Sequence, residues 1–205
     1  DNVNGNWKGR INLGLITPLD KKKALVLQAV LGANYRRNVD FVGLNGNAAS
    51  RSVVKTSGLQ ENVSLQWRLG KSSLSFKSKG DWGYTTSTRQ DFQPFNAINI
   101  NNGLTAQVLL PWKFQLGTDL TLYSRRGYAD KEMNTDDFVW NARLSRSFFK
   151  GRILAMIDGF DILGQLNNIT RMMNAQAITE TYSNVIPRYV MFHISYKLKT
   201  MPKKK

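Results

Sequence analysis

The chain has 205 residues, of which 41% are hydrophobic and 11% aromatic, and this composition excludes global disorder. The absence of cysteine excludes disulfides, thiolate nucleophiles and thiolate metal sites. The formal charge of +15 invites a nucleic-acid partner, but most basic residues are spread singly along the sequence, so none is predicted and anionic lipid headgroups fit this charge equally well.

Nine segments alternate apolar and polar residues with a period of two, as strands with two different faces do. No segment sustains apolar residues three and four positions apart, and no run of about 18 apolar residues predicts a membrane-spanning helix. The predicted strands are, in chain order, Trp7–Ile16, Ala24–Arg36, Gly58–Leu69, Ser72–Tyr84, Gly103–Leu110, Phe114–Arg125, Asp137–Phe148, Arg152–Leu163 and Arg188–Leu198.

Alternation alone leaves two folds open, a soluble barrel with its apolar side inside and a membrane barrel with its apolar side outside. The connections separate them, because tight turns at residues 17–23, 70–71, 111–113 and 150–151 alternate with long connections throughout the chain. Short periplasmic turns and long extracellular loops are typical of outer-membrane barrels. We therefore predict an all-β fold, an antiparallel transmembrane β-barrel in the cell outer membrane, with the C-terminus in the periplasm.

Aromatic residues agree with this orientation, because outer-membrane barrels carry aromatic girdles at both membrane interfaces. One group lies near the tight turns and the other near the long connections. The first comprises Trp67, Trp112, Phe148 and Phe149, and the second Tyr35, Trp82, Tyr84 and Trp140.

Three stretches in the last third carry a family pattern: "SRSFF" at Ser145–Phe149, "FDILG" at Phe160–Gly164 and "RYVMFHISY" at Arg188–Tyr196. In this order they resemble the end of TonB-dependent outer-membrane receptors, in particular the Bacteroidota-type outer-membrane β-barrel family. Two features depart from that pattern: "DILGQ" replaces a more usual aromatic and Asn, and "KTMPKKK" follows the last strand. The resemblance implies a 22-stranded barrel, a plug domain and contact with the TonB complex; a surface lipoprotein is a further partner among relatives.

Nine strands cannot form that barrel, and bacterial single-chain barrels have even strand numbers. An open sheet would also leave backbone groups unpaired in lipid. We therefore expect residues 1–198 to be the C-terminal strands of a larger barrel and residues 199–205 a basic periplasmic tail. The remaining barrel and the plug segment are expected outside the sequence given, and a separate chain is one place for them.

The predicted function is nutrient uptake without covalent chemistry, and no catalytic, cofactor-binding or metal-binding residue is predicted. The only histidine, His193, is interpreted as a polar-face residue, and the acidic segment Asp130–Asp137 as a solvated loop rather than a calcium site. The residues predicted to line the lumen are Arg10, Gln28, Arg36, Gln66, Arg68, Lys77, Asp119 and Arg143.

The last strand carries a predicted signal for the barrel-assembly machinery at Phe192, Ile194, Tyr196 and Leu198. Outer-membrane lipid and lipopolysaccharide are further expected partners, with Arg125, Arg126 and Arg171 as candidates for lipopolysaccharide phosphates. Two other functions stay open: a passive porin or structural outer-membrane barrel without a plug, and a soluble basic β-protein.

Overall fold

The computed structural model describes residues 4–42, 50–89, 92–128, 131–166, 169–173, 178–182, 186 and 188–198. Regular structure within these residues consists of strands and three single-turn 3₁₀ helices, and no helix there is long and apolar enough to cross a membrane. The strands are β1 (Trp7–Pro18), β2 (Leu25–Val42), β3 (Ser50–Leu69), β4 (Ser72–Ser87), β5 (Phe95–Leu109), β6 (Phe114–Arg126), β7 (Asp136–Phe148), β8 (Ile153–Phe160), β9 (Ile169–Met173), β10 (Ile178–Tyr182) and β11 (Tyr189–Tyr196). The 3₁₀ helices are η1 (Pro111–Lys113), η2 (Lys131–Met133) and η3 (Phe149–Gly151).

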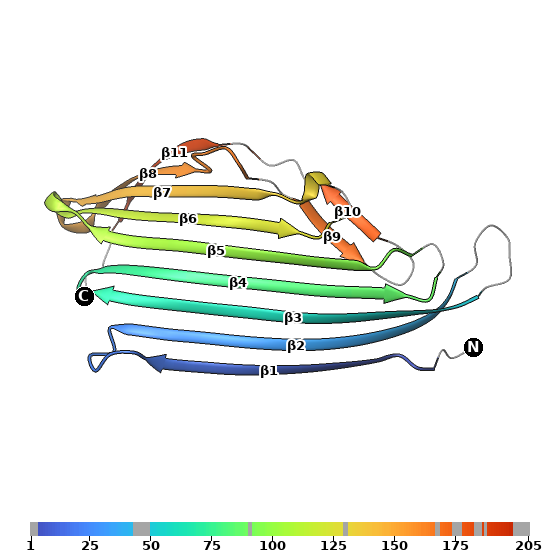
Figure 1. The fold of residues 1–205 in the computed structure, drawn as a ribbon. Coiled ribbons are helices and arrows are strands. Elements are labelled where there is room, and N and C mark those ends of the chain that lie inside the picture. Colours follow the sequence, from blue (N-terminus) through green and yellow to red (C-terminus); the bar gives the residue numbers. More distant parts are fainter. Residues whose placement is uncertain are drawn as a thin grey trace, which may run out of the picture.

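Nine of these strands form one antiparallel sheet in the order β1-β2-β3-β4-β5-β6-β7-β8-β11, drawn as a single curved layer in Figure 1. All nine predicted strands and the all-β fold class are confirmed. The hairpin β9–β10 forms a separate two-stranded sheet in the connection from β8 to β11, where no strand was predicted.

The sheet is open within the described residues, because β1 and β11 are its edges and are not paired with each other. An edge strand presents unpaired backbone N–H and C=O groups to its surroundings. The two edges are therefore ready to continue the sheet with further strands.

Three strands extend further towards the long connections than predicted. β2 continues to Val42, β3 begins at Ser50 and β5 begins at Phe95, through segments in which apolar alternation is weak. Backbone pairing continues there in unbroken register, for example from Arg36 opposite Thr56 to Val42 opposite Ser50. Cross-strand hydrogen bonds do not require an apolar face, so periodicity underestimates these strands.

The antiparallel order puts all four tight turns at one end of the sheet and all four long connections at the other (Figure 1). Two of the tight turns place an aromatic residue and a lysine at positive φ: Trp112 (57°) with Lys113 (61°), and Phe149 (51°) with Lys150 (54°). Such turns usually carry Asn-Gly, because bulky residues at positive φ are strained. The side chains of Trp112 and Phe149 are 79% and 72% exposed, so packing within the described chain does not offset this strain.

No second layer of the described chain covers the apolar face of the sheet. Ile11, Phe192 and Ile194 on that face are each more than 60% exposed. The few buried apolar side chains of the described residues lie towards the long connections. Val39, Val54, Ala97 and Val139 belong to strands of the sheet, and Met133 belongs to η2. A soluble monomer rarely exposes so large an apolar surface.

Candidate functional site: the polar face of the sheet

Strand register defines two faces, because residues directly opposite each other on neighbouring strands point to the same side. One cross-strand row contains Leu27, Leu65, Phe76, Leu104, Leu120 and Trp140, and its side is called the apolar face here. The adjacent row contains Gln28, Ser64, Lys77, Gly103 and Thr121, and its side is called the polar face.

All eight residues predicted to line a lumen share the polar face. They come from six strands: Arg10 (β1), Gln28 and Arg36 (β2), Gln66 and Arg68 (β3), Lys77 (β4), Asp119 (β6) and Arg143 (β7). No hydrogen bond or ion pair of the described residues joins any two of them. They form a dispersed polar wall and not a compact binding site.

The β1–β4 half of the polar face is basic and sparsely paired. Arg10 donates from Nε to Asn12 Oδ1 and from Nη2 to Gln60 Oε1, both at 3.1 Å. Lys79 and Asp81 are 3.8 Å apart in an exposed pair. Within the described part of the chain, four predicted residues have no side-chain partner: Arg36, Gln66, Arg68 and Lys77.

The β6–β11 half of the polar face contains paired charges. Asp158 on β8 is 2% exposed, and its Oδ1 accepts a hydrogen bond from Arg143 Nε on β7. Its Oδ2 lies 3.0 Å from His193 Nε2 on β11. Asp158 therefore joins three neighbouring strands through their side chains.

Asp158 is a residue that the sequence analysis missed. The sequence offered one signal for it: Asp158 follows the apolar residue Ile157 in the predicted strand, which places it on the polar face. Its contact with His193 depends on the pairing of β8 with β11, which are separated along the chain by the longest connection.

A second buried carboxylate, Asp161, lies in the turn that follows β8. Asp161 is 4% exposed and has a φ of 43°, and it accepts backbone N–H groups from Gln165 and Leu166 at 3.0 Å each. Its own N–H donates to Asn141 Oδ1 at 2.9 Å, and Asn141 Nδ2 donates to Asp119 Oδ2. This gives the "FDILG" segment a structural role, which is to hold the end of β8.

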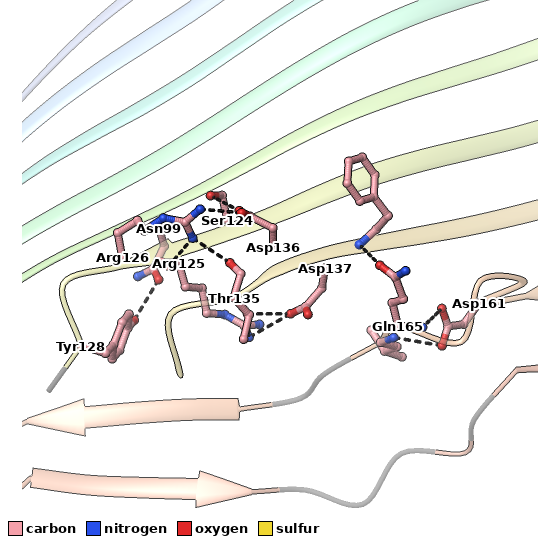
Figure 2. A network of polar contacts seen from close by, with 12 residues as sticks. Asn99, Ser124, Arg125, Arg126, Tyr128, Thr135, Asp136, Asp137, Asp161 and Gln165 are labelled. Carbon is pink, nitrogen blue, oxygen red and sulfur yellow. Dashed lines mark hydrogen bonds and ion pairs between the residues drawn. The ribbon is translucent and has the colours of Figure 1, made fainter. Parts of the chain in front are cut away.

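Polar contacts also fix the connection from β6 to β7 (Figure 2). Arg125 contacts Asp137 on the polar face at 3.4 Å, and Arg126 donates to Asp136 Oδ2 at 2.5 Å on the apolar face. Asp136 lies before the apolar part of β7; its hydrogen bond with Arg126 holds the pKa of this carboxyl below its usual range. Tyr128 Oη donates to Asn99 Oδ1 at 2.8 Å.

These pairings bear on two alternatives. The carboxylates of Asp136 and Asp137 are engaged by arginines and do not converge, and the described residues contain no group of three metal-ligating side chains. Of the arginines considered for lipid phosphates, Arg125 lies on the polar face, Arg126 is paired on the apolar face, and Arg171 has a side chain outside the described set.

A depression of about 510 Å³ lies near the tight-turn end of the sheet. Lys71 contributes a positive charge, the guanidinium of Arg143 is paired with Asp158, and Gln107, Gln115 and Ser145 contribute neutral hydrogen-bonding groups. Cations beside amides suit a carboxylate, a phosphate or a polyhydroxylated solute. Of the predicted lumen residues, only Arg143 belongs to it.

The apolar face has a polar interruption on β3 and β4. Glu61 occupies an apolar-face position opposite Leu31, and its Oε1 accepts a hydrogen bond from Ser78 Oγ at 2.7 Å. Gly80 gives this side chain room, because a Cβ there would lie 2.7 Å from Glu61 Cγ. Periodicity did not reveal it, since a single polar residue only weakens the pattern.

The predicted assembly residues lie on the apolar face of the edge strand. Phe192, Ile194 and Tyr196 are opposite Ile157, Ala155 and Ile153, and Leu198 follows the end of β11 with 82% exposure. This placement agrees with the prediction for their side, while their role in assembly stays a prediction. No protein-family model, curated protein or solved structure matches the chain significantly.

Proposed function

We propose that this chain forms part of the wall of a TonB-dependent outer-membrane receptor and that its polar face lines the uptake pathway. The apolar face contacts lipid, and further strands pair with the free edges of β1 and β11 to close the barrel. The tight turns and the end of β11 face the periplasm. The long connections, including hairpin β9–β10, face the outside of the cell.

One observation carries this proposal: a nine-stranded sheet with a continuous exposed apolar face and all its long connections at one end. Exposure of such an apolar face is favourable in a lipid bilayer, because the lipid chains cover the face as a second layer of protein would. A soluble sandwich would instead cover this face with a second sheet.

The receptor class rests on the resemblance of "SRSFF", "FDILG" and "RYVMFHISY" to the end of TonB-dependent receptors. The position of Asp161 supports it, because a buried turn carboxylate is a reason for an acidic residue in that element. The polar face then acts by hydrogen bonding and charge alone. Its unpaired cations on β1–β4 attract anionic or hydroxyl-rich solutes without any bond being made or broken.

Site-directed spin labelling of neighbouring positions tests the membrane part of the proposal. In the receptor reconstituted in vesicles, labels at Leu104→Cys and Leu120→Cys are expected to be accessible to oxygen, which concentrates in lipid. Labels at the matched polar-face positions Thr105→Cys and Thr121→Cys are expected to be more accessible to a water-soluble nickel chelate than to oxygen. Equal accessibility of both pairs to the chelate, or burial of the leucine positions from both reagents, would overturn lipid contact.

Conductance separates an energised receptor from the passive porin. The receptor reconstituted in planar bilayers is expected to stay closed to small ions, because its plug fills the lumen until the TonB complex acts. Steady open-channel currents from the intact protein would support the porin. Closed channels together with uptake that stops when the proton gradient is collapsed would support the receptor.

A further inference from the structure

A shallow hollow lies on the apolar face where β1 to β4 run side by side. Its volume is about 390 Å³, within the range of roughly 300 to 1,000 Å³ that is common for ligand sites. The lining surface is almost entirely apolar. Its side chains include those of Ile11, Ala33, Tyr35, Ser57, Leu59 and Trp82.

The hollow results from small residues placed opposite large ones. Ala33 lies between Ile11 and Leu59 in one cross-strand row, and the missing bulk at Ala33 leaves a gap between two larger side chains. In the next row Tyr35 lies between Gly9 and Ser57, so the gap continues along the strands on both sides of the ring. A hydrocarbon chain makes closer packing contacts in such a trough than on a flat sheet surface.

Two cations follow in the next row towards the long connections. Arg37 lies directly opposite Lys55 on the same face, two residues along each strand from Tyr35 and Ser57, which is about 7 Å. Arg37 Nη1 donates to the carbonyl of Gly5. Neither side chain has an acidic partner among the described residues, so their charges are uncompensated there.

Aromatic side chains mark the boundary between the hollow and the cations. The ring of Trp7 packs on that of Tyr35 with centroids 4.7 Å apart. Trp82 Nε1 donates to Asn96 Oδ1 at 2.7 Å. Rings with one apolar and one hydrogen-bonding side are enriched where lipid headgroups meet hydrocarbon.

We propose that this hollow, together with Arg37 and Lys55, binds a lipid with a phosphate-bearing headgroup. The acyl chain occupies the hollow, and the phosphate lies between the two cations, which form charge-assisted hydrogen bonds with it. This inference rests on the proposed function, because it places the apolar face in the outer leaflet. Lipopolysaccharide, already expected as a partner, is the outer-leaflet lipid with this chemistry.

The headgroup contacts can be tested by native mass spectrometry of the receptor after exposure to the phosphorylated lipid anchor of lipopolysaccharide. The double variant Arg37→Gln/Lys55→Gln is expected to retain about thirtyfold less of this lipid than the wild type, because each of the two cations contributes about 1 kcal/mol near a membrane surface. Lys21→Gln/Lys22→Gln removes two exposed cations from the tight-turn end and is expected to retain the lipid fully. Equal retention by both double variants would overturn the phosphate contact.

The chain contact has its own matched pair. Ala33→Phe fills the hollow and is expected to reduce retention several-fold, whereas Ala29→Phe adds the same ring to the same strand and face outside the hollow. A lipid anchor treated with phosphatase, and inorganic phosphate added as a competitor, distinguish the sources of binding. The proposal requires weak binding of the dephosphorylated anchor and at most partial displacement of the lipid by phosphate, because phosphate can compete for the two cations but not for the hollow. Equal binding of both anchors, or complete displacement by phosphate, overturns it.

Failure here would be distinguishable from failure of the proposed function. If the labels at Leu104→Cys and Leu120→Cys report lipid while all variants retain the lipid anchor equally, the apolar face contacts the bilayer without a specific lipid site. If those labels do not report lipid, the membrane location itself fails. Heat-modified gel migration of each variant checks that the barrel has formed.

Discussion

The two halves of the polar face differ in the length of their strands and in how many of their charged side chains are paired. In the β1–β4 half, β2 to β4 have 16 to 20 residues and β1 has 12, and several charged side chains have no partner in the described chain. In the β6–β11 half, the strands of the main sheet have 8 to 13 residues, and acidic side chains engage arginine, histidine and backbone groups. Side-chain support for the sheet is therefore concentrated in the β6–β11 half.

The support is clearest beside β7. Register between β7 and β8 begins at Ala142 opposite Gly159, so the first residues of β7 lack a β8 partner. The turn after β8 replaces it, because Ile162 N–H donates to the carbonyl of Trp140 at 2.8 Å. The Oε1 of Gln165 also accepts the Phe138 N–H at 3.0 Å (Figure 2). A side chain and a turn thus continue the ladder.

The largest expected effect is the loss of Asp161. Asp161→Ala removes the acceptor of two backbone amides and puts alanine at a positive φ, so the free energy of unfolding should fall by about 3 kcal/mol. Asp20→Ala is the matched change in the first half, where Asp20 accepts only the Leu25 N–H, and should cost about 1 kcal/mol. Urea unfolding of the folded protein in detergent measures both. Equal costs would remove the distinction between the halves.

Asp158 gives the next largest effect. Asp158→Ala leaves Arg143 and His193 without their shared carboxylate and should lower the unfolding free energy by about 2 kcal/mol. Asp81→Ala breaks only the exposed pair with Lys79, and exposed pairs contribute less than about 1 kcal/mol. A loss at Asp81 as large as that at Asp158 would show that the first half also depends on charge pairing.

The sequence predicts the part of this molecule that depends on local repetition. Period-two alternation identified all nine strands of the main sheet, and turn length indicated which strand ends lie together. It placed Arg10 and Arg143 on one side because side-chain direction follows from residue parity along a strand.

The rest depends on contacts between distant segments. Asp158 meets His193 only when β11 pairs with β8 across the intervening hairpin, and nothing near either residue encodes that pairing. The continuation of β2 to Val42 depends on the partner strand, since its own polar residues weaken the pattern. Hairpin β9–β10 is similarly short and lacks strong alternation.

Glu61 provides a smaller effect of opposite sign. On a lipid-facing surface a carboxylate is unfavourable, so Glu61→Leu should raise the unfolding free energy in vesicles by about 1 kcal/mol. Gln60→Leu, one residue away on the polar face, should lower it, because it removes the acceptor of Arg10 Nη2. Stabilisation by the second change and destabilisation by the first would reverse the assignment of the two faces.

The smallest expected effect tests whether the cations of the first half are dispensable for stability. Arg36→Gln/Lys77→Gln should change the unfolding free energy by less than about 0.5 kcal/mol, since neither side chain has a described partner. Uncompensated like charges repel, and salt screens that repulsion. The wild type should therefore gain stability as ionic strength rises, and the double variant should gain less. If the double variant instead loses stability and keeps the full salt dependence, Arg36 and Lys77 already bind a partner within the receptor. Neither cation would then be free to bind a solute.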